Sequence, residues 1–143
     1  MFSGEYSHAL DAKGRLTIPA RFRDELEGGL VVTKGYEPCI LLYPLGEWSA
    51  LASKVAQLPK TNRAARAYSR LVFGSAAEVT PDKMGRILIP NFLREYAEIG
   101  EEAVIVGVNT YIEIWNPARW RATLEQDMDN LADILDDVSK MGI

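Results

Sequence analysis

The chain has 143 residues, 48% of them hydrophobic and 25% charged, with a formal net charge of −4. These values suit one globular domain or two very small ones, and they argue against a disordered chain and a general polyanion binder. The sequence also has no apolar run that approaches the roughly 20 residues needed to span a bilayer. Residues 1–15 show neither a basic leader nor an apolar signal core. We therefore expect a cytoplasmic protein that does not contact membranes.

The charge is unevenly distributed along the chain. Residues 1–75 carry 10 Lys/Arg and 7 Asp/Glu, whereas residues 76–143 carry 6 and 13. A nucleic-acid binder of this composition has to gather its basic groups on one surface and repeat weak contacts over several copies. The chain has one cysteine, Cys39, and one histidine, His8. A structural zinc site and an internal disulfide are therefore not expected, and no cofactor is predicted.

The first half of the chain predicts a β-α-β-β order of elements followed by a longer helix. Its β-rich stretches are 5–10, 15–18, 30–33 and 39–44. A brief helix over 19–26 starts at a proline, which suits the first helical turn because its missing N–H has no partner there, and Gly28-Gly29 is expected to end it. The closing amphipathic helix has apolar positions at Leu45, Trp48, Leu51, Val55 and Leu58.

The linker over 59–75 is basic. If it is helical, Arg63, Arg66 and Arg70 lie on one face. Two interpretations remain open here. Either this face is solvated or paired with an acidic helix such as the C-terminal one, or it faces nucleic acid.

The second half repeats the first at a displacement of 71 positions, the difference between 82 and 11. Six residues recur: Asp11, Gly14, Arg15, Ile18, Pro19 and Arg23 match Asp82, Gly85, Arg86, Ile89, Pro90 and Arg94. The second set of β-rich stretches is 75–80, 86–89, 103–108 and 111–115, with a brief helix over 90–99 that Gly100 is expected to end. One repeat of about 45 residues is too small to bury a core alone, so we predict an α+β fold with two repeats about a pseudo-twofold axis. The expected units are 1–58, 59–75 and 76–143.

The C-terminal helix is longer and has two contrasting faces. Its apolar positions are Leu124, Met128, Leu131, Leu135 and Val138, and its acidic residues are Glu125, Asp127, Asp129, Asp133, Asp136 and Asp137. Either the apolar stripe faces the core and the acids are solvated, or the stripe docks on a neighbouring subunit.

The charged turn DAKGR at 11–15 returns as DKMGR at 82–86. Asp suits the first position of a type I turn, where its carboxylate accepts a backbone N–H two residues on, and Gly suits the fourth. In one interpretation an Asp–Arg pair only holds the hairpin. In the other, Asp fixes the loop while Arg presents a planar fork of donors to phosphate or guanine. The sequence has no phosphate-binding glycine loop and no nucleophile elbow, so an enzyme is not expected.

Five stretches resemble the MraZ family of bacterial transcriptional regulators, whose chains hold two AbrB-type swapped-hairpin halves. They are MFSGEY, LDAKGRLTIPARFR, CILLYPLGEW, DKMGRILIPNFLREYA and the run from VGV to EIWNPARW. The paired D-x-x-x-R turns are the most specific part. The resemblance implies a double-split β-barrel in which strands of the two halves interleave. It also implies self-association into a closed ring of eight or twelve subunits.

The resemblance further implies binding to tandem G-rich direct repeats in double-stranded DNA. The implied role is repression of the division and cell-wall gene cluster that includes the protein's own gene, at the nucleoid. The family's DNA-contacting loops correspond here to Asp11, Lys13, Arg15, Asp82, Lys83 and Arg86. Because Met84 replaces the first loop's Lys13, we expect the second loop to bind more weakly. The alternative from another class is a ring-forming protein-interaction scaffold or an antitoxin-like module.

Overall fold

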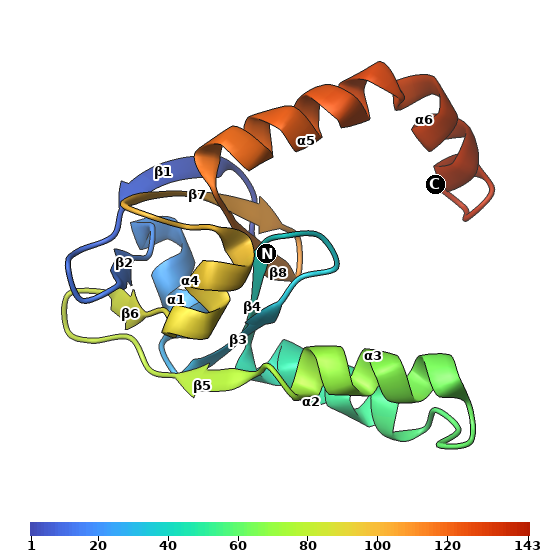
Figure 1. The fold of residues 1–143 in the computed structure, drawn as a ribbon, viewed down its shortest axis with the longest axis horizontal. Helices are drawn as coiled ribbons and strands as arrows, with labels where there is room; N and C mark the ends of the chain where they lie inside the picture. The colour runs from blue at the N-terminus through green and yellow to red at the C-terminus, as the bar shows by residue number, and fades with distance from the viewer.

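The computed structural model describes residues 1–143 as an α+β fold, which confirms the predicted class (Figure 1). Its centre is a six-stranded sheet with strand order β1-β7-β8-β4-β3-β5 and antiparallel pairs throughout. The strands are β1 Glu5–Ala9, β3 Leu30–Lys34, β4 Ile40–Pro44, β5 Ala77–Val79, β7 Glu102–Val108 and β8 Tyr111–Trp115. A separate two-stranded ribbon pairs β2 (Arg15–Thr17) with β6 (Arg86–Leu88). Every predicted β-rich stretch is therefore confirmed as a strand.

Strands of the two repeats are interleaved. β1 of the first repeat pairs with β7 of the second, β5 of the second pairs with β3 of the first, and β2 pairs with its counterpart β6. The hydrogen bonds do not close a barrel, because β1 and β5 remain as edges of the large sheet and the ribbon is a sheet of its own. The two repeats thus share one sheet, and neither forms it alone.

The sheet buries apolar side chains on both faces. The main core contains 18 buried residues and takes in the ribbon through Leu16 and Ile87. The second core lies on the opposite face, where Trp48 and Trp120 pack against five buried residues: Cys39, Leu41, Tyr43, Val104 and Trp115. Successive side chains of a strand point to opposite faces, so β4 supplies alternate residues to the two cores.

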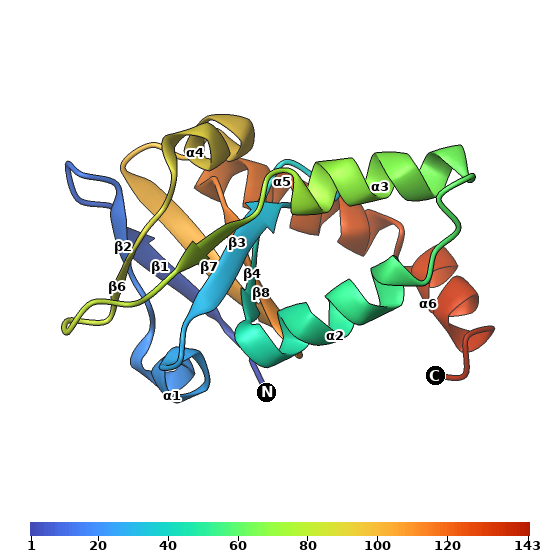
Figure 2. The ribbon, with the colours of Figure 1, turned by 90° about the horizontal axis from the view of Figure 1, so that it is seen from below.

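The helices are a 3₁₀ turn Ala20–Phe22, α1 Arg23–Leu26, α2 Leu45–Ala56, α3 Arg63–Phe73, α4 Asn91–Ala97, α5 Pro117–Asp129 and α6 Leu131–Ser139. α1 and α4 lie close to the strands, whereas the α2–α3 pair and the α5–α6 arm extend away from the sheet (Figures 1 and 2). The two brief helices, the closing helix of the first repeat and a helical linker are confirmed. The helices are too short or too polar for any of them to traverse a lipid bilayer.

Two predictions about the helices are wrong. The C-terminal helix is not continuous but breaks at Asn130 (φ −105°, ψ 17°), whose side chain donates to the carbonyl of Gln126 at 2.9 Å and so competes with the helical pattern. Gly100 does not end α4, because Glu98 takes the left-handed conformation with φ 55°. The next residue, Ile99, is buried in the main core, so the chain has to leave the helix before Gly100.

Candidate nucleic-acid interface

The first charged turn is organised by the Asp11 carboxylate. Its Oδ1 accepts from the backbone N–H of Lys13 at 3.0 Å and of Arg15 at 2.9 Å. The N–H of Gly14 donates to the Asp11 carbonyl at 3.0 Å, and Gly14 has φ +82°. A left-handed residue at this position closes the hairpin, and glycine adopts that conformation without strain. The turn geometry predicted from DAKGR is confirmed.

The second turn has the same geometry. Asp82 Oδ1 accepts from the N–H groups of Met84 and Arg86, both at 2.9 Å. The N–H of Gly85 donates to the Asp82 carbonyl at 3.0 Å, with φ +75° at the glycine. Only backbone atoms of the third loop residue hold the turn, so Met84 in place of the first loop's lysine leaves the loop shape unchanged. It does put an apolar side chain at the position where the first loop has a cation.

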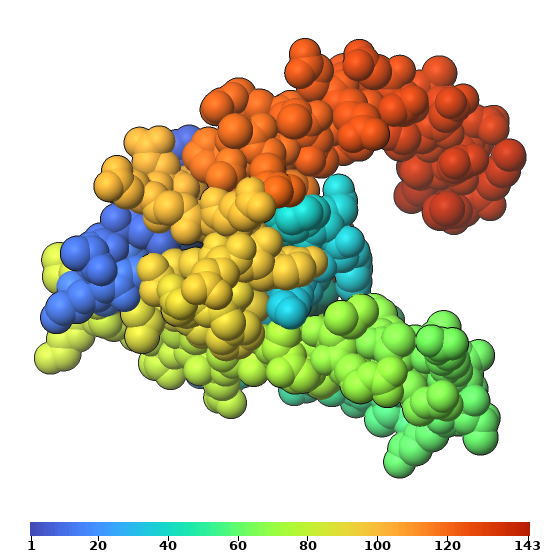
Figure 3. All heavy atoms as spheres, in the orientation of Figure 1, coloured from blue at the N-terminus to red at the C-terminus, as the bar shows by residue number.

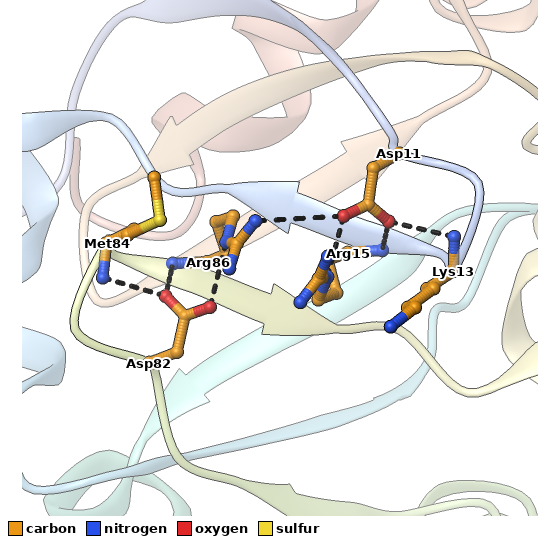
Figure 4. A network of polar contacts seen from close by, with 6 residues as sticks. All are labelled: Asp11, Lys13, Arg15, Asp82, Met84 and Arg86. Atoms are coloured by element: carbon orange, nitrogen blue, oxygen red, sulfur yellow. Dashed lines mark hydrogen bonds and ion pairs between the residues drawn. The ribbon is translucent and has the colours of Figure 1, made fainter.

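Each aspartate also orients an arginine. Arg15 Nε donates to Asp11 Oδ2 at 2.6 Å, and Arg86 Nε donates to Asp82 Oδ2 at 2.8 Å. The terminal nitrogens of both guanidinium groups make no hydrogen bond within the chain, and Arg86 Nη1 lies 3.9 Å from Asp11 Oδ2. Figure 4 shows the two arginines in the middle, over the β2–β6 ribbon, with an aspartate on each outer side. Each ion pair therefore holds its loop through Nε and leaves the terminal nitrogens of the guanidinium group free of hydrogen bonds.

Both aspartates are held in the charged form. The backbone N–H of Arg15 lowers the pKa of Asp11, with further lowering by the Arg15 side chain. The backbone N–H of Arg86 lowers the pKa of Asp82 in the same way. Hydrogen bonds donated to a carboxylate favour its ionised state. At neutral pH each carboxylate is thus an acceptor that can keep its arginine in place.

The ribbon brings the two loops to the same end of the molecule (Figures 1 and 2). Leu16 faces Ile87 at its centre, where both side chains are fully buried. Beyond the ribbon, Ile18 N donates to the Gly85 carbonyl at 2.8 Å, and Ile89 N donates to the Gly14 carbonyl at 3.0 Å. Each loop is therefore bonded to the segment that follows the other loop, and the two cannot move independently.

The lysines complete the loops at their exposed tips. Lys13 and Lys83 are both exposed, and neither side chain makes an ion pair or hydrogen bond within the chain. The six residues predicted from the two motifs are thus gathered in one place: Asp11, Lys13, Arg15, Asp82, Lys83 and Arg86. No group of three or more His, Cys, Asp or Glu side chains is arranged to hold a metal ion.

Two arginines that the motif did not include support the loops from the other repeat. A Cβ placed on Gly14 would lie 2.7 Å from Arg94 Cζ, and one on Gly85 would lie 2.7 Å from Arg23 Cζ. Arg94 Nε donates to the Ile89 carbonyl at 3.1 Å, and Arg23 Nε donates to the Ile18 carbonyl at 3.0 Å. The sequence does carry a signal for them, because Arg23 and Arg94 recur at the same displacement of 71 as the loops.

The arginines of the linker lie elsewhere. Arg63, Arg66 and Arg70 are exposed on α3, and Arg66 Nη1 donates to the Lys60 carbonyl at 2.9 Å. None of them forms an ion pair, and the acidic residues of α5 and α6 do not pair with them within the chain. This face is therefore separate from the loops, and its intrachain pairing with the C-terminal helix is absent.

Comparison with known proteins assigns the family. The family model described as "MraZ protein, putative antitoxin-like" matches residues 1–71 and again residues 72–138, once for each repeat. A protein of Pediococcus pentosaceus is 46% identical over the whole of both chains, and one of Clostridium acetobutylicum is 48% identical over the whole of both. A protein of Carboxydothermus hydrogenoformans is 49% identical over 94% of this chain and 99% of its own. All three are named transcriptional regulator MraZ. With matches over both repeats and the full length, the chain belongs to the MraZ family.

Proposed function

We propose that the protein regulates transcription by binding double-stranded DNA through its two D-x-x-x-R loops. The observation that carries this proposal is the pair of arginines, each tied to an aspartate through Nε while its terminal nitrogens make no hydrogen bond. Guanine offers the acceptors O6 and N7 in the major groove, and a guanidinium fork meets both with parallel hydrogen bonds. An orienting carboxylate reduces the entropy lost when the fork binds. A G-rich operator follows from this chemistry.

The other loop residues have supporting roles in the proposal. Asp11 and Asp82 orient the forks, while Lys13 and Lys83 contact phosphates at the exposed tips. Phosphate contacts position a protein on DNA, and base contacts give it specificity. The first loop has its lysine at the third position, two residues from the arginine, where the second loop has Met84. We therefore propose that the second loop contributes less to affinity than the first.

Multivalent binding to tandem direct repeats is the second part of the proposal. The resemblance to the family supports a closed ring of eight or twelve copies, which presents the same pair of loops many times. Linked contacts raise the effective concentration of the next one, so weak single contacts suffice. We propose that the interleaved strands form a double-split barrel of the swapped-hairpin kind. Its units are 1–58, 59–75 and 76–143, and the paired loops belong to the first and the last.

The proposed target follows from the family alone. It is the division and cell-wall gene cluster that includes the protein's own gene, repressed at the nucleoid in the cytoplasm. Three relatives that match nearly the whole chain are named transcriptional regulators, which supports a role in transcription and leaves the choice of target to the family resemblance.

The test is binding to a duplex with four tandem G-rich repeats, followed by fluorescence anisotropy, against a scrambled duplex of the same composition. Arg15→Ala should abolish repeat-specific binding and leave assembly size unchanged, with a smaller loss for Arg86→Ala. Arg121→Ala is the matched control, because Arg121 is an exposed arginine on α5 outside the loops. The affinity should fall steeply as salt rises, since phosphate contacts release counterions. Unchanged affinity in Arg15→Ala would refute the assignment of the loops.

A second candidate is a protein-interaction module, and the family description favours it because it contains the words antitoxin-like. In that case the loops bind a protein partner instead of DNA. The wild-type protein would then leave the anisotropy of the repeat duplex unchanged, even at low salt. Capture of one protein partner that depends on Arg15 and Arg86 would identify this function.

A further inference from the structure

α6 is a helix whose apolar side has no partner. Leu131, Ile134 and Leu135 are exposed by 40%, 37% and 60%, and Val138 is half-buried. A helix of nine residues is marginal in water by itself and takes its stability from packing of its apolar face. The arm formed by α5 and α6 stands off from the body of the molecule (Figures 1 and 3). An uncovered face on such a short helix indicates that it packs against something else.

A groove between α2 and α3 has the complementary character. It has a volume of about 500 Å³, and Ala52, Val55, Leu58 and Phe73 supply apolar parts of its lining. Lys60, Arg66 and Arg70 also line it. No residue of α2 is buried, and Val72 is the one buried residue of α3, so much of the surface of this helix pair remains uncovered.

The arm and the groove match in pattern and in charge. Leu131, Ile134, Leu135 and Val138 stand at i, i+3, i+4 and i+7, the spacing with which an amphipathic helix lies in an apolar groove. Residues 125–140 carry six acids and one lysine, whereas residues 59–75 carry four Lys/Arg and no acid. Asp137 borders the apolar stripe, one helical turn from Asp133, and Arg66 and Arg70 stand one turn apart on α3.

We propose that α6 of one copy docks in the α2–α3 groove of a second copy of this chain. The arm does not fill its own groove: α6 makes no hydrogen bond or ion pair with α2 or α3, and open space separates them (Figure 3). The direction of the arm is set at its base. Asn116 Oδ1 caps α5 by accepting from the N–H groups of Ala118 and Arg119, and Arg119 Nη2 pairs with Glu98 at 2.7 Å.

This contact is heterologous, because the arm and the groove are different surfaces. Repetition of a heterologous contact gives a ring when the rotation closes and a filament when it does not. The inference rests on the self-association proposed above and adds the surfaces that make it. It does not involve the DNA loops, which lie at the other end of the molecule.

The contact is tested by cross-linking between copies. Leu135→Cys and Val55→Cys are prepared as separate full-length proteins, mixed and treated with a short bis-maleimide. The natural Cys39 is buried and its pKa is raised by that burial, so it remains unreactive. A heterodimeric product is expected from the mixture, and its yield should fall several-fold in either preparation alone.

Charge reversal provides the second measurement. Arg66→Glu with Arg70→Glu, or Asp133→Lys with Asp137→Lys, should raise the dissociation constant of the assembly by about tenfold or more, because either reversal sets like charges against one another beside the apolar contact. The two double variants mixed together should restore assembly, measured by light scattering over a concentration series. Arg21→Glu, an exposed charge reversal outside both surfaces, is the control and should leave the size unchanged.

The outcomes separate this contact from the rest of the proposed function. A mixture that gives no cross-link between copies overturns the contact. So does unaltered assembly in both charge-reversed variants, although self-association then still stands. A wild-type chain that stays monomeric yet binds repeat DNA overturns both the contact and the ring, and leaves the DNA loops unaffected.

Discussion

Gly14→Ala should destabilise the protein by an amount that comes from two separable effects. Gly14 has φ +82°, a conformation that a residue with a Cβ reaches at a cost of about 1–2 kcal/mol. The added Cβ would lie 2.7 Å from Arg94 Cζ and 2.9 Å from Nη2. The three atoms nearest to this Cβ all belong to the flexible Arg94 side chain, so the arginine moves.

The displaced arginine adds the second effect. Arg94 Nε donates to the Ile89 carbonyl at 3.1 Å in a partly buried position, and loss of such a bond costs about 1 kcal/mol. The expected total is therefore about 2–3 kcal/mol. In an Arg94→Ala background the clash disappears and the cost of Gly14→Ala should fall to the backbone effect alone. The double-mutant cycle should give a coupling of about 1 kcal/mol.

Urea unfolding followed by circular dichroism measures these values, at one fixed protein concentration because self-association adds to apparent stability. Gly28→Ala is the matched control, since no atom lies within 4 Å of the position that its Cβ would take and its φ is not in the left-handed region. It should change the free energy of unfolding by less than about 0.5 kcal/mol. A cost for Gly14→Ala no larger than that of this control, or an unchanged cost in the Arg94→Ala background, would contradict the displacement of Arg94.

Three further predictions concern the loops and the N-terminus. Arg15→Lys keeps the charge but loses the fork, so affinity for G-rich repeats should fall by about 1–3 kcal/mol in anisotropy while binding to scrambled DNA is nearly unchanged. The pKa values of Asp11 and Asp82 are lowered in the folded protein, so the two carboxylates add to the free energy of unfolding. This contribution is complete above the usual aspartate pKa of about 3.9 and is lost as pH falls through the lowered pKa values. Urea unfolding should thus show a weaker acid dependence in the double Asp→Asn variant, with no difference in slope between about pH 6 and 8. Phe2→Ala should cost about 3–5 kcal/mol in the same assay, because Phe2 is 1% exposed and packs edge-on against Phe22 at 5.2 Å.

The elements of this fold can be predicted because local signals agree with the tertiary structure. Each β-rich stretch becomes a strand, and the turns at 11–15 and 82–86 take the shape that Asp and Gly favour locally. The repeat adds the pseudo-symmetric relation between them. Strand pairing is less accessible, because alternation of apolar residues shows which face a side chain takes and not which strand lies beside it. The exchange of β1 and β5 between the repeats therefore follows from the resemblance and the structure, not from periodicity.

The wrong predictions have local causes that only the packed structure reveals. Gly100 is the better helix end by composition, but burial of Ile99 requires the turn two residues earlier, at Glu98. The break at Asn130 depends on one side-chain hydrogen bond to Gln126. The recurrence of Arg23 and Arg94 marks both residues in the sequence but does not reveal their role, because each one contacts the glycine of the other repeat, far away along the chain.

The net charge of −4 is a poor guide to DNA binding by this chain, because its charges are separated in space. The two loops lie at one end of the longest axis and α6 lies at the other (Figure 1). α5 alone, with 13 residues at about 1.5 Å each, spans about 20 Å, more than twice the Debye length of about 8 Å at physiological salt. The acids of the arm would therefore repel DNA only weakly at the loops that we propose to bind it. Docking of the arm against Arg66 and Arg70 of another copy would offset charge at that end as well, so that the arginine loops remain the surface on which unpaired cationic donors are concentrated.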